Sequence, residues 1–335
     1  MTYFVLISAF VMSWVLTLCL RRYALAKSVL DIPNERSSHS IPTPRGGGVA
    51  IVLTVSAGIA ALSCAGLIPV DSSIAYLGAG LGVAALGFAD DHGHIAARWR
   101  LAGHALSASW ALYWLKGLAP LSFAGMELSF GVVGTVVGVI YLVWMLNLYN
   151  FMDGIDGLAS VEAITVCAGA CLMYALTGHL TLSVVPLLVA LATLGFLLWN
   201  FPIARIFMGD AGSGFLGVLL GALALEAAWI DQQLFWAWIV LLGVFIVDAT
   251  WTLGHRLLRK QRVYEAHRSH AYQIASRYYG SHKKVTVAVA AINCVWLWPV
   301  AFCIGLGYVG PPVGVLLGFI PLACVAWHFR AGSAE

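Results

Sequence analysis

The sequence predicts an all-α, polytopic membrane protein. Of its 335 residues, 61% are hydrophobic and only 10% are charged, whereas soluble domains carry about 25% charged residues. The apolar residues also come in runs long enough to cross a hydrocarbon core of ~30 Å as helices. These two observations exclude a soluble globular protein.

Eleven apolar runs are candidates for transmembrane helices, and ten spans are the alternative because one run is short and rich in glycine. The runs cover residues 2–20, 46–68, 74–89, 99–116, 129–149, 158–177, 183–200, 214–230, 235–253, 285–305 and 312–328. The seven cysteines lie almost entirely within these runs, so they indicate small buried side chains and not a disulfide or zinc framework. We expect one transmembrane transferase domain that extends over residues 1–335.

Lys and Arg residues predict the orientation of this domain, because short cytoplasmic loops retain positive charge. Every Lys and Arg except Lys116 falls on one side if that side carries the C-terminal tail, the loops 21–45, 90–98, 147–157, 201–213 and 254–284, and the adjacent helix ends. The N-terminus is therefore expected outside and the C-terminus in the cytoplasm. The net charge of +3 is explained by topology, so it does not indicate a nucleic-acid partner. No cleavage signal is expected at the first run.

Polar residues that carry chemistry gather on the predicted cytoplasmic side. Asp90 and Asp91 are adjacent at the end of a run, and charges so close repel each other unless a cation neutralises them; a solvated helix end is the alternative. Asn147, Asn150 and Asp153 follow at three-residue steps that would share one helical face, and Asp156 lies one step further. Helix capping explains one Asp but not four aligned polar groups.

Two glycine-rich segments each open a run. Asp210 lies within the segment 207–214, and a turn of this kind offers free backbone N–H groups and a positive dipole end to a phosphate. An Asp that merely caps the helix is the alternative. Arg45 precedes three glycines in the same style, and the loop 254–284 supplies His267, Arg268 and His270. The Lys and Arg residues of that loop are equally compatible with binding lipid headgroups.

These parts together indicate Mg²⁺ held by carboxylates and substrate phosphates, with Arg and His balancing the remaining negative charge, as phosphoryl transfer requires. The position at one membrane face favours a lipid phosphate as one substrate. The sequence contains neither a Walker A motif nor His-Glu-x-x-His, which excludes P-loop ATPases and zinc metalloproteases.

Four motifs in this order and spacing resemble the polyprenyl-phosphate N-acetylhexosamine-1-phosphate transferases, the superfamily that includes the phospho-MurNAc-pentapeptide translocase. The resemblance runs from about residue 31 to 273 and rests on Asp31-x-Pro33-x-x-Arg36-x-x-His39-x-x-Pro42-x-Pro44-Arg45-Gly46-Gly47, on Asp90-Asp91, on Asn147-x-x-Asn150-x-x-Asp153-Gly-x-Asp156-Gly-Leu, and on Asn200 with Phe207-Met-Gly-Asp210-x-Gly-Ser.

The resemblance implies a role for each site residue. Asp210 is the expected principal metal ligand, supported by Asp91, with Mg²⁺ as the cofactor and Mn²⁺ as a substitute. The expected catalytic residues are Asp90, Asp91, Asp156, His267, Arg268 and His270, and the expected substrate-binding residues are Arg45, Asn147, Asn150, Asp153, Asn200 and Phe207. In this assignment Phe207 stacks on uracil, Asp153 accepts from the base, and Asp156 lies near the metal and diphosphate.

The implied reaction transfers N-acetylhexosamine-1-phosphate from a UDP-sugar to undecaprenyl phosphate and releases UMP. Family members that use UDP-GlcNAc or UDP-MurNAc-pentapeptide usually carry a triple-histidine motif, but residues 266–273 here read Ala-His-Arg-Ser-His-Ala-Tyr-Gln. This resembles the branch that initiates O-antigen, with a 6-deoxy-HexNAc, GlcNAc or GalNAc as the sugar. A UDP-GlcNAc transferase for another wall polymer is the alternative. The resemblance implies a bacterial inner-membrane location and, for many members, a homodimer.

Two other classes of membrane protein fit the sequence less well. A secondary transporter should carry ionisable residues near mid-membrane on helices broken in repeated halves, whereas the ionisable residues here gather at one face. An intramembrane aspartyl protease needs two facing acids within spans, and Asp210 follows Phe-Met-Gly instead of Gly-x-Gly.

Overall fold

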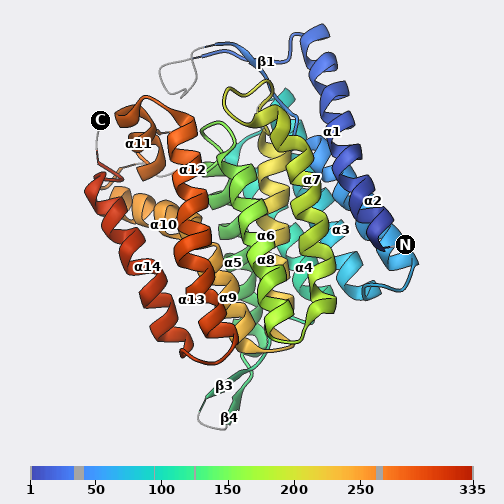
Figure 1. Cartoon of the computed structure of the whole chain (residues 1–335), viewed down its shortest axis with the longest axis vertical. Coiled ribbons are helices and arrows are strands. Elements are labelled where there is room, and N and C mark those ends of the chain that lie inside the picture. Colours follow the sequence, from blue (N-terminus) through green and yellow to red (C-terminus); the bar gives the residue numbers. More distant parts are fainter. Residues whose placement is uncertain (1, 34–40, 94, 124–125, 262–266, 334–335) are drawn as a thin grey trace.

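The computed structural model describes residues 2–33, 41–93, 95–123, 126–261 and 267–333. Arg36 and His39 of the first motif lie outside this part of the chain. The helices in chain order are α1 (Thr2–Ala26), α2 (Val49–Cys64), α3 (Val70–His92), α4 (Ala97–Trp114), α5 (Gly131–Phe151), α6 (Leu158–Leu176), η1 (Leu180–Ser183), α7 (Val184–Asn200), α8 (Asp210–Ala228), α9 (Gln232–Leu241), α10 (Gly243–Leu258), α11 (Ala271–Tyr279), α12 (His282–Ile292), η2 (Asn293–Leu297), α13 (Trp298–Gly305) and α14 (Pro311–His328). The structure confirms an all-α membrane protein (Figure 1).

Within the described residues, eight helices are long and apolar enough to cross a membrane, or nine if α9 and α10 form one span bent by 69°. Each of the eleven predicted runs is helical. The two runs that fall short of this standard are α2, which has only 16 residues, and α4, which has two arginines in its first turn. Eleven spans, and the predicted orientation, therefore stay predictions.

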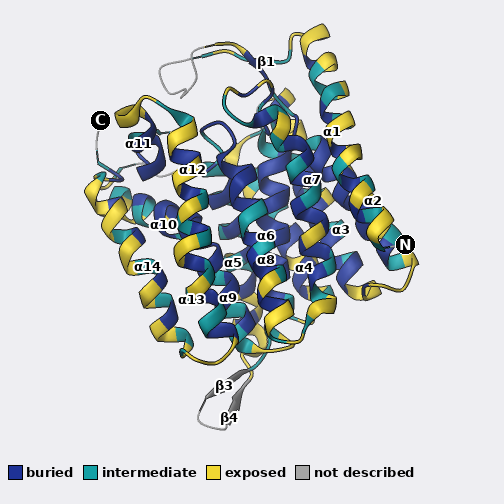
Figure 2. Ribbon diagram, viewed as in Figure 1, coloured by how far each residue is buried: buried dark blue, intermediate teal, exposed yellow. Residues whose placement is uncertain are grey.

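Helix α8 forms the centre of the bundle and contacts α2, α3, α5 and α9. Its glycines allow this close packing: a Cβ on Gly217 would lie 2.7 Å from the Leu146 Cα of α5. Small residues at helix contacts are the usual means by which membrane helices approach each other. Figure 2 shows the result, with buried residues along the central helices and exposed residues on the outer ones.

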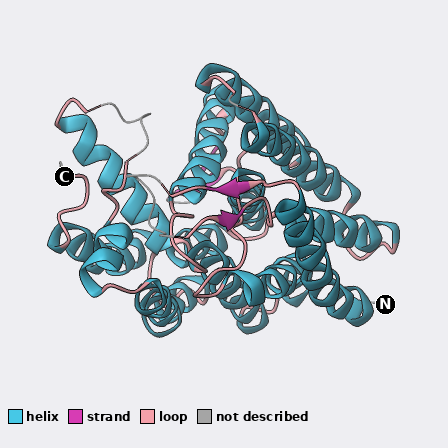
Figure 3. Cartoon of the chain, turned by 90° about the horizontal axis from the view of Figure 1, so that it is seen from above, coloured by secondary structure: helices cyan, strands magenta, loops and turns pink. Residues whose placement is uncertain are grey.

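Two short antiparallel hairpins lie at opposite ends of the bundle in Figure 1. Strands β1 (Leu30–Asp31) and β2 (Thr43–Pro44) pair at the end where α8 begins, and β3 (Leu121–Phe123) pairs with β4 (Met126–Leu128) at the other. From above, strands and loops lie across the middle of the surrounding helices (Figure 3). The loops of this first end bring the motif residues together.

Several predicted loops are shorter than expected because the flanking helices continue into them. Helix α3 extends through Asp90 and Asp91 to His92, and α5 extends to Phe151. Within the predicted loop 254–284, α10 continues to Leu258, α11 is an additional helix, and α12 begins at His282. The prediction that Asp153 shares a helical face with Asn147 and Asn150 was wrong, because α5 ends before Asp153.

Candidate active site

The N-termini of α2 and α8 lie side by side because two glycine-rich loops are bonded backbone to backbone. The Gly47 and Gly48 N–H groups donate to the Phe207 and Met208 carbonyls, each at 2.9 Å. A Cβ on Gly48 would lie 2.5 Å from the Gly212 Cα, so only glycine permits this approach. Two helix N-termini at one place give a region of positive potential, which favours phosphate.

The end of α3 packs against the first turn of α8 and carries the adjacent acids. Asp91 is buried, at 7% exposed, and Arg45 donates to its backbone carbonyl while approaching its carboxylate at 3.9 Å. The Asp210 and Ala211 N–H groups face its carboxylate, and Oδ2 forms no hydrogen bond of good geometry with the described residues. It also lies 2.8 Å from the position that a Cβ on Gly209 would occupy. An unpaired carboxylate oxygen thus points at the start of α8.

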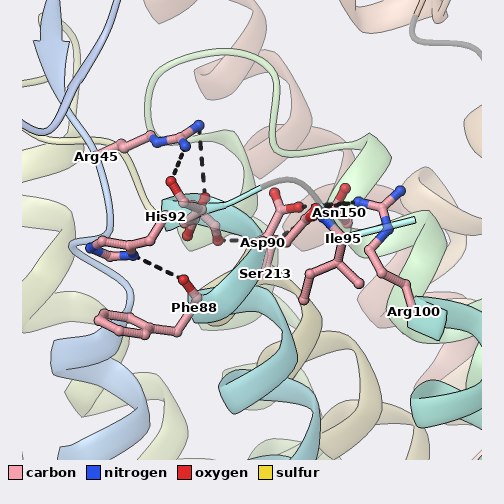
Figure 4. Close-up of polar contacts among 11 residues, drawn as sticks. Arg45, Phe88, Asp90, His92, Ile95, Arg100, Asn150 and Ser213 are labelled. Atoms are coloured by element: carbon pink, nitrogen blue, oxygen red, sulfur yellow. Dashed lines mark hydrogen bonds and ion pairs between the residues drawn. The ribbon is translucent and has the colours of Figure 1, made fainter. Parts of the chain in front are cut away.

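Arg100 of α4 links the other two carboxylates of this end of the bundle. Its guanidinium forms an ion pair with Asp90 and lies 3.8 Å from Asp210 Oδ2, while Asp90 Oδ1 accepts the Ile95 N–H at 2.8 Å. In Figure 4, Arg45 and Arg100 approach the end of α3 from opposite sides. Nothing in the chain order places Arg100 beside Asp210, so in the sequence this residue indicates only topology.

The end of α5 and the following loop complete the acidic cluster. The Asn150 amide donates to Ser213 Oγ at 3.0 Å, which joins α5 to α8. The Asn147 amide donates to the Val143 carbonyl one turn earlier, so this contact is within α5. Burial and the negative charges of Asp210, Asp91 and Asp156 raise the pKa of Asp153 well above its ordinary value.

The donor set fits Mg²⁺, although no three His, Cys, Asp or Glu side chains in the described part of the chain are already arranged as a metal site. Mg²⁺ usually binds one or two carboxylates and completes its shell with waters and substrate phosphates. Asp91, with its unpaired Oδ2, and Asp210, whose side chain is 39% exposed, are the two carboxylates best placed to hold the ion.

A cavity of about 630 Å³ opens beside this cluster. Its lining includes Phe207, Arg268, His282 and Lys283, together with Asp156. Asp156 Oδ2 accepts the Ala204 N–H at 3.0 Å, and its Oδ1 lies 3.2 Å from His282 Nδ1. Asp156, and not Asp153, therefore lines the cavity with Phe207, and the roles predicted for the two acids stay predictions.

Asn200 lies next to this cavity but is almost fully buried, at 3% exposed. Its side-chain oxygen accepts the Gly157 N–H at 3.0 Å, and its amide donates to the Ile206 carbonyl at 3.0 Å. These bonds fix the start of α6 against the loop that carries Phe207.

A matching family profile, glycosyl transferase family 4, covers residues 73–228. The phospho-N-acetylmuramoyl-pentapeptide-transferase of Kocuria rhizophila is 33% identical over 261 residues, which cover 61% of this chain and 67% of the relative. The chain belongs to the polyprenyl-phosphate N-acetylhexosamine-1-phosphate transferase family.

Two further relatives align over most of the transferase. The probable undecaprenyl-phosphate N-acetylglucosaminyl 1-phosphate transferase of Bacillus subtilis is 28% identical over 286 residues, covering 84% of this chain and 79% of the relative. The undecaprenyl-phosphate alpha-N-acetylglucosaminyl 1-phosphate transferase of Thermotoga maritima is 28% identical over 281 residues, covering 84% of each chain. The resemblance found in the motifs is thereby confirmed at the level of the family.

The transferase departs from the sequence prediction most clearly in the loop before α11. His270 is 2% exposed, and its Nδ1 lies 3.3 Å from Asp248 Oδ1, while Asp248 also accepts the Ala271 N–H at 2.9 Å. His270 is therefore buried at the start of α11, whereas Arg268 lines the cavity. His267 stacks on His270 with ring centroids 4.9 Å apart. Burial and the neighbouring His270 lower the pKa of His267 to about 4, so His267 is neutral at pH 7.

Proposed function

We propose that this transferase moves N-acetylhexosamine-1-phosphate from a UDP-sugar to undecaprenyl phosphate, with Mg²⁺ as cofactor, at the cytoplasmic face of a bacterial inner membrane. The observation that carries the proposal is that one loop connects the two parts of the site: Phe207 lines a cavity together with Asp156 and Arg268, and Asp91 faces Gly209, next to Asp210, at the end of the same loop. A nucleotide in the cavity would extend its diphosphate toward the acids. Undecaprenyl phosphate is the proposed acceptor because it stands in the names of two relatives.

The reaction is a single displacement at the sugar-linked phosphorus. An oxygen of the lipid phosphate forms the new P–O bond, and the bond from that phosphorus to the bridging oxygen of UMP breaks. UMP leaves with the bonding electron pair, and the polyprenyl-diphosphate sugar remains in the membrane. Bound Mg²⁺ would neutralise diphosphate charge at Asp91 and Asp210.

Each site residue has a part in this step. With Asp91 supporting the metal, Asp90 is the acid that accepts the proton from acceptor molecules that are still monoanionic, since the second pKa of a phosphate monoester is ~6. Phe207 supplies an aromatic face for the base, and Asp156 supplies a carboxylate in the same cavity. Arg268 contributes a permanent cation that offers two parallel N–H donors to a phosphate. Arg100 holds Asp90 and Asp210 together without contributing a proton.

The identity of the sugar is the most detailed element of the proposal. The loop sequence around Arg268 favours a 6-deoxy-HexNAc and the first step of O-antigen synthesis, whereas the names of the relatives favour GlcNAc. Both alternatives use the same chemistry at phosphorus, so they differ only in the contacts made by the sugar.

UMP release by purified protein in detergent, with undecaprenyl phosphate and a panel of UDP-sugars, tests the function. We expect release that requires both the lipid and Mg²⁺, and that is lost in Asp210→Asn. A covalent sugar-phosphate or UMP adduct formed without lipid would contradict the single displacement. Uptake of the sugar into vesicles without UMP release would favour a transporter.

A further inference from the structure

Glu162 is a fully buried acid inside α6, and the transfer mechanism does not use it. Glu162 is the fifth residue of α6. A charged carboxylate within a membrane-spanning segment is unfavourable unless it is paired, so such residues are usually functional. Its carboxyl accepts from the Phe245 backbone N–H of α10 and from the Asn293 side chain of η2. Segment η2 is the one π-helical turn among the described residues, and π-helical turns inside longer helices often mark functional positions.

A seam of hydrogen bonds joins α6 to the helix α12–η2–α13. The Asn293 amide donates to Glu162 Oε2 and to Thr165 Oγ1, both at 2.7 Å. The same seam reaches the cavity at its other end, where Thr286 Oγ1 donates to the Asp156 carbonyl at 2.9 Å and His282 lies beside the Asp156 carboxylate. The buried pair and the cavity thus share one helix contact.

Two oxygens of this pair remain without a partner. Glu162 Oε1 and Asn293 Oδ1 are both buried and unbonded in the described structure. An unsatisfied buried polar atom is unfavourable by ~1–3 kcal/mol, so two on one bonded pair need an explanation. A proton on Oε1 would explain both oxygens, because Oε1 would then donate to Asn293 Oδ1 while Oε2 accepts from the Asn293 amide.

We propose that Glu162 is held as a neutral carboxylic acid that forms a cyclic acid–amide pair with Asn293, and that this pair positions His282 against Asp156. The second amide proton of Asn293 goes to Thr165, so every polar atom of the group is bonded and no charge remains in the membrane. His282 begins α12, and Asn293 directly follows its last residue. A displacement at Asn293 is therefore transmitted along one short helix to the cavity.

The decisive variant is Glu162→Gln, because the Gln amide can donate to Asn293 Oδ1 where the acid O–H did. We expect the KM for the UDP-sugar and kcat to stay within about twofold of the wild type. Glu162→Leu and Asn293→Leu remove the pair, and we expect each to raise the KM for the UDP-sugar about tenfold, a change of 1.4 kcal/mol, with the KM for the lipid unchanged. The link to donor binding rests on the proposed function.

Two measurements separate positioning from general loss of structure. In a His282→Ala background, Asn293→Leu should change the KM for the UDP-sugar no further, because the two residues act through one contact. In infrared spectra of the purified protein, Glu162→Gln should remove a carbonyl band of a protonated carboxyl. Glu226→Gln is the matched control, since Glu226 accepts from two hydroxyls, Ser72 and Tyr76, and has no amide partner in the described contacts; it should leave that band in place.

Activity loss in Glu162→Gln equal to that in Glu162→Leu would overturn the proposal, since it would show that a carboxylate charge or a bound cation is needed. Additive effects of Asn293→Leu and His282→Ala, or an unchanged infrared spectrum in Glu162→Gln, would overturn it as well. Failure of the proposed function is a different result, in which the wild type releases no UMP with any UDP-sugar while the infrared comparison still reports on the pair.

Discussion

Gly87→Ala tests whether the contact between α3 and α8 sets the geometry of the site. A Cβ on Gly87 would lie 2.5 Å from the Ala211 nitrogen and 2.6 Å from the Asp210 carbonyl carbon. Both are backbone atoms, and van der Waals contact needs ~3.5 Å, so the two helices must separate by about 1 Å. Asp91 lies one turn beyond Gly87 and would move away from Asp210.

A misplacement of 1 Å lowers rates by about a hundredfold, and we expect kcat for UMP release to fall by this factor. Overpacking should also lower the free energy of unfolding by ~1–3 kcal/mol, measurable as a lower Tm. Gly254→Ala is the control, because a Cβ there meets nothing within 4 Å and Ala favours a helix. A kcat for Gly87→Ala within twofold of the wild type, or an equal loss in Gly254→Ala, would refute the reasoning.

Three further predictions follow from the same site. Asp210→Asn should lower kcat about a thousandfold, and EDTA should bring the wild type to the same level; activity of the variant at saturating Mg²⁺ would contradict this. Arg100→Gln should lower kcat about tenfold, while Arg98→Gln, which removes only a contact with Trp99, should have little effect. Folding lowers the pKa of His267 to about 4, so on acidification this imidazole is protonated at a higher pH in the unfolded chain than in the folded chain. The free energy of unfolding should therefore fall as the pH drops from about 6.5 to 4. His267→Gln should reduce this slope in denaturant titrations.

The sequence was sufficient to predict the fold class, because long apolar runs have few structural outcomes in a membrane. It also predicted the grouping of Asp91, Asp210 and Asn150, since their motifs lie at the ends of runs on one side. Helix ends were less predictable: hydropathy falls at Asp90, yet α3 continues through His92 because α8 packs against it.

What the sequence could not predict concerns side chains whose partners are remote in the chain. His270 has the spacing of a catalytic histidine, but Asp248 of α10 holds it at the start of α11. Asp153 and Asp156 have nearly identical local sequences, and only the bonds from Ala204 and His282 place Asp156 in the cavity. The partner of Glu162 cannot be predicted from the sequence, because Asn293 lies 131 residues away.

That separation of 131 residues has a consequence for biogenesis. At a synthesis rate of ~5–20 residues per second, α6 leaves the ribosome roughly 7 to 26 s before Asn293 does. During this interval Glu162 has to be accommodated by the insertion machinery or by water at the membrane surface. The segment α12–η2 lines the cavity through His282 and is synthesised late. Its insertion is thus also the step that gives Glu162 of the earlier helix α6 its partner in the membrane.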